Sequence, residues 1–349
     1  MAKQTNSTAS SEETFLQNLI DTGIVGESEI DRENQIITVE GEEIYYGGEL
    51  ELTDIYVALY TDGTLVFNSE NEFNESMVEI NYGNIKGQEY NCEEDVYAPW
   101  HDNSDNIVKV TFLSRIVPSS TASWFYECSK METIENLNYL KVDKVTDMSY
   151  MFSYCEILTE IDVSTFNTSN VTNMCEMFGD CYELKELDLS AWNTSNVINM
   201  SWMFFDCTGL LELNLSNFNT SKVTDMSWMF AACSVLPSLD LSSFDTSKVT
   251  DMSTMFASCI ELSDLDLDNF DVGKVTDMSF MFVNTRNLSG KITIRGNIID
   301  NYERMFNNAA INPDSEFVVN YVEETSSIVD SLINTKSENS NVIKGEKME

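Results

Sequence analysis

Histidine is nearly absent from this sequence, and basic residues are scarce. The chain has one histidine, His101, so a Ser–His or Cys–His catalytic pair would depend on that residue alone, and no nucleophile motif surrounds it. Lys and Arg together number 19 against 59 Asp and Glu, a formal charge of −40. Such a charge repels phosphate backbones and anionic lipid head groups. We therefore expect no nucleic-acid partner, no membrane insertion and no enzymatic activity.

Long apolar runs are also missing. No stretch of about 18 apolar residues occurs, which predicts no membrane-spanning helix. The first apolar cluster, Phe15–Ile20, is interrupted by Gln17 and Asn18 and is too short for the core of a signal peptide, so no secretion signal is visible. Gly-rich phosphate loops and Cys-x-x-Cys metal spacings do not occur either, and we expect no bound organic cofactor.

A 26-residue repeat dominates the middle of the chain. One unit, residues 223–248, reads VTDMSWMFAACSVLPSLDLSSFDTSK. The first valine of the unit recurs every 26 positions, as Val145, Val171, Val197, Val223, Val249 and Val275. A fixed period of this length is typical of a solenoid, in which residues one repeat apart become neighbours in space.

The apolar positions within the unit predict its local structure. Leu239-Asp240-Leu241 alternates apolar and polar residues with period two, which predicts a half-buried strand. Stacked copies would form one parallel sheet with rows about 4.8 Å apart. Upstream, residues 226–236 place apolar side chains at steps of three or four, which predicts a tight helical turn with one face inward. The many methionines follow from two columns of the repeat and need no cofactor to explain them.

The flanking segments predict caps for the solenoid. Residues 1–34 are expected to form a disordered lead and a short helix over Glu12–Ile24, and residues 35–118 a small β-rich N-terminal cap domain with a hairpin turn at 60–63. The predicted strands of that domain are Gln35–Val39, Glu43–Tyr46, Ile55–Tyr60, Thr64–Asn68 and Val108–Phe112. The solenoid follows at 119–312. A C-terminal cap at 313–335, with a strand over Ser315–Tyr321 and a helix over Glu324–Asn334, precedes a disordered tail at 336–349.

The consensus V-T-D-M-S-x-M-F-x-x-C-x-x-L-x-x-L-D-L-S-x-F-(N/D)-T-S-(K/N) closely resembles the 26-residue repeat of BspA-like leucine-rich repeat surface proteins of bacteria. The resemblance continues upstream through Leu59–Phe67, Trp100, Ile107–Phe112 and Ser120–Phe125. It implies a leucine-rich-repeat-like solenoid of stacked parallel β-strands and short helical turns at a cell surface, adhering to host or neighbouring-cell proteins. The sequence departs from that family in showing no signal, lipobox or wall-sorting tail.

The cysteines raise the question of a disulfide framework. Five of the eight lie 26 residues apart and would stack in one column: Cys155, Cys181, Cys207, Cys233 and Cys259. Neighbours in such a column lie within reach of each other, but their Cβ vectors point the same way, which is poor geometry for a disulfide. We therefore interpret them as reduced, buried small hydrophobes.

Two acidic columns fall on the outward positions of the predicted sheet. One consists of Glu160, Glu186, Glu212 and Asp264, and the next of Asp162, Asp188, Asp240 and Asp266. Like charges about 4.8 Å apart repel by roughly 1 kcal/mol per pair even in water. Bound cations, with calcium as the candidate, or a basic partner would relieve that repulsion. The alternative is that the side chains splay apart and salt screens the remainder. A two-carboxylate glycoside hydrolase is the remaining enzymatic alternative.

A variable column follows the repeated serine: Tyr150, Glu176, Trp202, Trp228, Thr254 and Phe280. A core position would stay apolar in every copy, so this column is expected to be at least partly exposed. Its aromatic members, Tyr150, Trp202, Trp228 and Phe280, are candidate anchors for a protein or glycan partner. The alternative is partial burial against the adjoining coil.

Together these observations favour a non-catalytic cell-surface adhesion or protein-binding protein whose ligand is a host matrix or cell-surface protein. A cell-surface or secreted location is implied by the resemblance alone. The alternative is an intracellular or particle-associated structural or assembly scaffold, for which the missing secretion signal is the main support.

Overall fold

The structure, a computed structural model, describes residues 30–31, 36–39, 42–45, 52–94, 96–296 and 298–349. Contacts divide the chain into two units, Met1–Glu51 and Leu52–Glu349. In the first, β1 (Ile30–Asp31), β2 (Ile36–Val39) and β3 (Glu42–Tyr45) form an antiparallel sheet in the order β1-β2-β3. The two strands predicted there are confirmed within one residue at each end, and the predicted helix Glu12–Ile24 lies outside the described residues.

The second unit begins with a five-stranded sheet. Its strands are β4 (Tyr56–Tyr60), β5 (Thr64–Asn68), β6 (Val78–Asn84), β7 (Lys109–Phe112) and β8 (Thr133–Glu135), in the order β6-β4-β5-β7-β8. The predicted hairpin is confirmed, with Gly63 at φ +82° in its turn. Pairing is antiparallel around β4 and parallel from β5 through β7 to β8. The sheet thus changes to the parallel arrangement that the following coils require.

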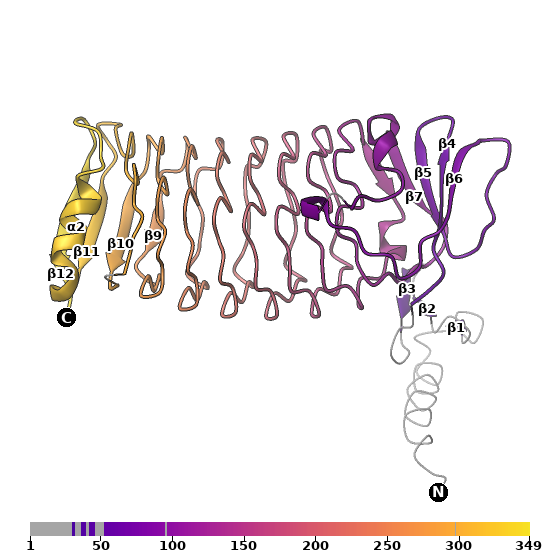
Figure 1. Ribbon diagram of the computed structural model, residues 1–349, viewed down its shortest axis with the longest axis horizontal. Helices are drawn as coiled ribbons and strands as arrows, with labels where there is room; N and C mark the ends of the chain where they lie inside the picture. Colours follow the sequence, from indigo (N-terminus) through magenta and orange to yellow (C-terminus); the bar gives the residue numbers. More distant parts are fainter. Residues whose placement is uncertain (1–29, 32–35, 40–41, 46–51, 95, 297) are drawn as a thin grey trace, which may run out of the picture. The chain divides into compact units, whose positions relative to one another are not determined.

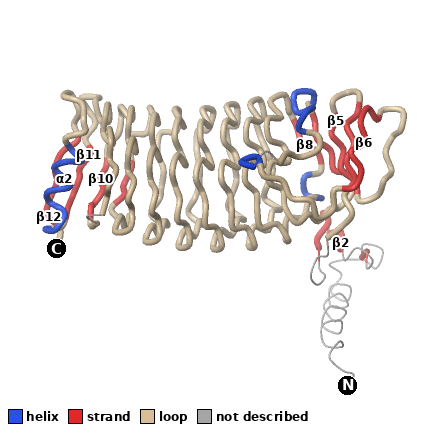
Figure 2. The backbone as a smooth tube through the Cα atoms, in the orientation of Figure 1, coloured by secondary structure: helices blue, strands red, loops and turns tan. Residues whose placement is uncertain are grey.

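Three short 3-10 helices accompany these strands: η2 (Cys92–Glu94) and η3 (His101–Asn106) lie between β6 and β7, and η4 (Leu137–Tyr139) follows β8. Beyond them the repeats stack as successive coils, visible as the row of loops in Figures 1 and 2. The fold is a β-solenoid of about nine turns with parallel strands and very little helix. The predicted solenoid is confirmed, since Leu187, Leu213 and Leu239 lie buried in one continuous core.

Backbone hydrogen bonds between coils concentrate on one side of each turn. Alternate residues from Met148 to Tyr154 donate N–H groups to carbonyls from Asn173 to Gly179 at 2.9–3.0 Å, and every donor points to the following coil. We call this surface the turn ladder. It consists of residues 121–127, 148–154, 174–180, 200–206, 226–232, 252–258, 278–284 and 302–308.

The turn ladder differs from the predicted helical turn. Bonds from Met151 N–H to the Met148 carbonyl and from Ser153 N–H to the Tyr150 carbonyl do form three-residue turns. However, Tyr150 and Tyr154 have φ of +58° and +59°, and such left-handed residues prevent a helix from propagating. Of the strands predicted at the Leu-Asp-Leu segments of the repeat, β9 (Leu265–Leu267) is a regular strand. We expected those segments to form the hydrogen bonds between coils, but most of these bonds lie in the turn ladder instead.

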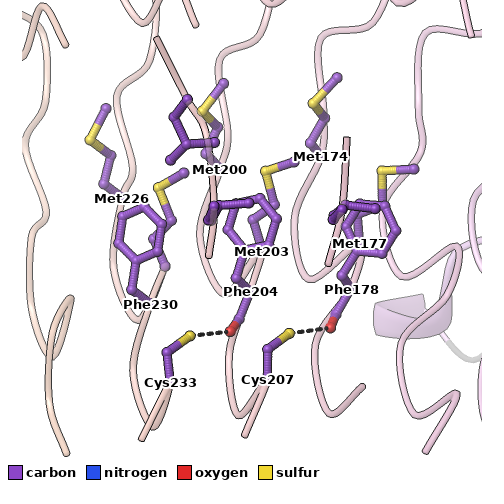
Figure 3. Packing of buried hydrophobic residues seen from close by; sticks show 14 of the residues in the cluster. Met174, Met177, Phe178, Met200, Met203, Phe204, Cys207, Met226, Phe230 and Cys233 are labelled. Atoms are coloured by element: carbon purple, nitrogen blue, oxygen red, sulfur yellow. Dashed lines mark hydrogen bonds between the residues drawn. The ribbon is translucent and has the colours of Figure 1, made fainter. Parts of the chain in front are cut away.

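The core consists of stacked columns of identical side chains (Figure 3). Phe178, Phe204 and Phe230 stack with ring centroids 6.1 and 5.8 Å apart. The Cys207 thiol donates to the Phe178 carbonyl oxygen at 3.1 Å, and each cysteine of the column repeats this contact one coil back. All eight cysteines are free and seven are buried, which confirms the interpretation from spacing. Burial raises the pKa of the Cys207 thiol well above its ordinary value.

A buried threonine column joins the coils at the opposite corner of the repeat. Its members are Thr168, Thr194, Thr220 and Thr246. The Thr220 hydroxyl donates to the Asp245 carbonyl oxygen at 2.9 Å and accepts from the Asp245 N–H at 2.8 Å. Each hydroxyl therefore satisfies two backbone groups of the next coil, which explains why a polar residue is retained in the interior.

The C-terminal cap extends the same stack. Strands β10 (Gly290–Ile294), β11 (Phe317–Tyr321) and β12 (Val342–Lys347) continue from β9 in parallel, in the order β12-β11-β10-β9. The short helix η5 (Glu323–Thr325) leads into α2 (Ser326–Ile333), so the predicted strand and helix are confirmed. The prediction of a disordered tail at 336–349 was wrong, because β12 pairs with β11 over most of its length. The polar composition of this segment gave no indication of β12, which lies at the edge of the sheet.

Both ends of the turn ladder have polar caps. At the C-terminal end, the N–H groups of Phe306 and Asn308 donate to the Thr335 and Ser337 hydroxyls at 3.0 Å. At the N-terminal end, the Trp100 indole N–H donates to the Trp124 carbonyl oxygen at 2.5 Å. These contacts replace the missing neighbouring coil and complete the backbone pairing at those positions.

Candidate binding surfaces

A groove of about 1440 Å³ crosses the strand rows of the first coils. Its acidic lining consists of Glu132, Glu135, Glu160, Asp162, Glu186, Asp188, Glu212 and Asp240. Apolar side chains lie between these acids, and one of them, Leu211, is 58% exposed. No Lys or Arg lines the groove. Lys109, outside the lining, pairs with Glu135 at 2.6 Å, and the groove as a whole combines a net negative charge with accessible apolar surface.

The two predicted acidic columns differ in their hydrogen bonds. Asp188 Oδ1 accepts the Ser190 backbone N–H at 2.9 Å, and Asp162 and Asp240 make the same contact with Ser164 and Ser242. The hydrogen bonds from Ser190 lower the pKa of the Asp188 carboxyl. These aspartates stabilise the turn that follows each strand row.

Within the described part of the chain, the glutamates of the other column accept no such turn-stabilising hydrogen bond. Glu160, Glu186 and Glu212 are exposed, and all three line the groove. Asp264, the fourth member of that column, lines a smaller hollow farther along the same face together with Asp266. The glutamates are therefore the side chains that a partner in the groove would meet.

The acidic face ends at a lysine. Lys291 lies in the row after Asp266, and its ammonium contacts the Asp268 carboxylate at 2.6 Å and the Asp266 carboxylate at 3.3 Å. An ammonium group thus fits against two carboxylates of the adjoining row that are two residues apart. Within the described part of the chain, no group of three or more His, Cys, Asp or Glu side chains is arranged to hold a metal ion. The calcium hypothesis stays a prediction.

The predicted aromatic column lies along the turn ladder. Tyr150, Trp202, Trp228 and Phe280 are half-buried, whereas Thr254 in the same column is buried. Trp202 and Trp228 stack face to face with centroids 4.2 Å apart and planes 8° apart. Tyr150 instead packs edge-on against Tyr126 of the preceding coil. The structure therefore brings together Trp202 and Trp228 and leaves Tyr150 and Phe280 at other positions along the ladder.

The backbone at this column is strained. Trp202 and Trp228 have φ of +61°, a left-handed conformation that costs roughly 1 kcal/mol or more for residues other than glycine, asparagine and aspartate. Four residues farther on, a second left-handed column carries residues of mixed type, among them Tyr154, Asp180, Ala232 and Asn284. Both columns are left-handed in every coil, so this conformation is a property of the turn and is not confined to the aromatic copies.

Sequence reasoning missed several residues of the same surface. Phe205 packs edge-on against Trp202 at 4.7 Å and against Trp228 at 5.7 Å. Tyr126 contacts both Tyr150 and Tyr154 edge-on at 6.0 Å. These side chains lie three or four positions after the variable column, so the same column analysis applied to the neighbouring positions would have found them.

Asp180 is the most unusual charged residue on the turn ladder. It is 4% exposed, and its Oδ1 accepts the Tyr182 hydroxyl at 2.9 Å, but its Oδ2 is buried and has no hydrogen-bond partner. Burial, with smaller contributions from the Asp206 and Glu156 charges, raises the pKa of the Asp180 carboxyl to about 6. Nothing in the repeat pattern distinguishes this aspartate from the exposed ones.

The single histidine lies at the N-terminal end of this surface. The His101 ring stacks on Tyr97 with centroids 4.1 Å apart, and its Nε2 lies 3.1 Å from Glu127 Oε2. The Tyr126 ring also stacks on the His101 ring, with centroids 5.7 Å apart. His101 is therefore held in an aromatic cluster and contacts a carboxylate.

Comparison with known proteins identifies the repeat region. The described residues include no helix that is long and apolar enough to cross a bilayer. No curated protein and no solved structure matches the chain. Residues 119–234 and 207–317 match a family described as Mycoplasma protein of unknown function, DUF285, and the solenoid with this match fits a BspA-like repeat protein loosely. Taken together, the two matches span residues 119–317, more than half of the 349 residues, so the chain belongs to the DUF285 family.

Proposed function

We propose that this chain is a non-catalytic protein-binding protein of the cell surface that holds a basic, extended segment of a host or neighbouring-cell protein in its acidic groove. The solenoid and the family are consistent with protein binding. Adhesion, the surface location and the choice of partner are the further steps of the proposal.

The groove carries the proposal. Glu160, Glu186 and Glu212 repeat at the row spacing of the coils, with apolar side chains between them. An extended segment places residues two apart on one face, about 6.6 Å from each other. Where that face carries basic residues with an apolar residue among them, the long flexible basic side chains can adjust to the row spacing of about 4.8 Å. Such a segment would neutralise the glutamates and cover the exposed Leu211, which supplies both charge complementarity and buried apolar area. Lys291, bound between Asp266 and Asp268, supports the fit of a lysine to this face.

The test replaces three groove glutamates without changing their shape. The variant Glu160→Gln/Glu186→Gln/Glu212→Gln keeps the aspartates that stabilise the turns, so the fold is expected to persist. Binding to a panel of immobilised host matrix proteins is measured against wild type by surface plasmon resonance at two salt concentrations. We expect salt-dependent binding that falls about tenfold or more in the variant, since three charge contacts are lost.

A matched control removes the same charge elsewhere. Glu75→Gln/Glu183→Gln/Glu338→Gln changes three exposed glutamates outside the groove, so the net charge is identical to that of the groove variant. Retained binding in the control supports recognition in the groove. Equal loss in both variants would show that only net charge matters, and the groove would no longer explain binding.

A further inference from the structure

We infer that the turn ladder is a second recognition surface, which takes arginine side chains of a partner protein on the stacked Trp202–Trp228 pair. None of the residues that line the groove belongs to the turn ladder, so this surface is independent of the groove. Beyond the proposed function, the turn ladder would recognise one particular side chain, arginine, at a surface separate from the groove.

The first support is a partly exposed aromatic platform. The two indoles are half-buried and form one flat stack with centroids 4.2 Å apart, edged by Phe205. The left-handed backbone at this column recurs in every coil from Ser123 to Arg304, so it belongs to the fold, and the stacked indoles are what distinguishes these two coils.

The second support is the charge around that platform. The ladder segments from 148–154 through 278–284 contain Glu176, Asp180 and Asp206 and no Lys or Arg. Glu127 adds a further carboxylate at the N-terminal end, beside the aromatic cluster of His101. Aromatic faces and carboxylates both attract cations, and tryptophan is the strongest aromatic partner for a guanidinium group. The surface thus fits a cationic side chain with a planar head.

The third support is the incomplete satisfaction of Asp180. Its buried Oδ2 lacks a hydrogen-bond partner, so the surroundings destabilise the ionised carboxylate. A positive charge held against the ladder lowers the energy of this carboxylate through space, since the interaction is weakly screened at a covered site. The protein alone does not provide that charge.

An arginine explains these observations better than a metal ion. The residues described in the structure contain no cluster of three or more metal-ligating side chains, and a bare ion would not use the indole stack. Arginine also stacks on aromatic planes while its N–H groups remain free for carboxylates, which lysine cannot do. A sugar would use the indoles but would not require the carboxylates.

Hexa-arginine and hexa-lysine peptides provide a direct test with the full chain. Trp100, Trp124 and Trp192 are buried, so Trp202 and Trp228 are the two of the five tryptophans placed to report on a ligand by fluorescence. We expect hexa-arginine to quench this fluorescence and to bind about fivefold more tightly than hexa-lysine, the ratio that about one cation–π contact provides. The preference should disappear in Trp202→Ala/Trp228→Ala and persist in Trp202→Phe/Trp228→Phe, with circular dichroism confirming the fold of both.

The outcomes separate this inference from the groove proposal. Glu160→Gln/Glu186→Gln/Glu212→Gln should weaken both peptides equally and leave the arginine preference unchanged. Equal affinity for the two peptides, or a preference that survives Trp202→Ala/Trp228→Ala, overturns the ladder inference without affecting the groove. Saturable quenching by a neutral oligosaccharide, with no arginine preference, would overturn it in favour of a glycan site.

Discussion

Replacing Asp180 by asparagine should stabilise the protein, and the gain should grow with pH. Asparagine keeps the shape of the side chain, tolerates the left-handed backbone at φ +57° and retains an oxygen that can accept the Tyr182 hydroxyl. What it removes is the charge of a carboxyl that is 4% exposed and whose Oδ2 has no partner. The substitution therefore isolates the effect of burying that charge.

The magnitude follows from the pKa of Asp180. Burial raises this pKa from 3.8 to about 6, so the folded chain binds a proton more tightly than the unfolded chain. Stability from this group is fully present below pH 3.8 and is lost as the pH rises through about 6. Proton linkage gives a loss of about 1.6 kcal/mol at pH 5.0 and about 3 kcal/mol at pH 7.5. The difference, about 1.4 kcal/mol, belongs to the ionisation of Asp180.

Urea unfolding of wild type and Asp180→Asn at pH 5.0 and 7.5 measures this difference. Both values avoid the region near the isoelectric point of about 4.1, where the uncharged protein would precipitate. Any effect of the amide group itself is the same at both pH values and cancels. An advantage of Asp180→Asn that stays constant between the two pH values, or that shrinks as the pH rises, would refute the reasoning.

Three further predictions use other parts of the fold. Thr220→Val should lower the free energy of unfolding by about 1–3 kcal/mol in urea titration, because the Asp245 N–H and carbonyl groups lose the two hydrogen bonds to the buried Thr220 hydroxyl; an unchanged midpoint would show that the hydroxyl contributes nothing. Native chain treated with a thiol reagent should react at Cys92 alone and at all eight cysteines after unfolding, since seven thiols are buried; fast reaction of several thiols in the native state would contradict the core. Trp202→Ala/Trp228→Ala should keep a cooperative thermal transition within a few degrees of wild type, because both indoles are only half-buried and alanine already occupies the other left-handed column, as Ala232 at φ +63°; major unfolding would show that the pair is structural.

Much of the architecture could be predicted from the 26-residue period. A fixed period places residues one repeat apart in the same environment, so a column that is apolar in every copy must belong to the core. The stacked Phe204 ring, the Cys207 thiol and the buried Leu213 all follow from this argument. The candidate aromatic column was found in the same way, because its chemistry varies from copy to copy. Periodicity is a property of the chain alone, and it determined which residues are neighbours.

Only the tertiary structure decided what each neighbour does. Asp188 and Glu186 belong to equally acidic columns and both line the groove, yet Asp188 also accepts the backbone N–H of Ser190, because the direction of the turning backbone brings that group to it. The left-handed residues that carry the turn ladder, the buried Oδ2 of Asp180 and the pairing of β12 depend likewise on the path of each coil and on the elements that cover its ends. The sequence by itself determined which residues stack. The three-dimensional course of the backbone decided which polar groups are satisfied within the protein and which are not.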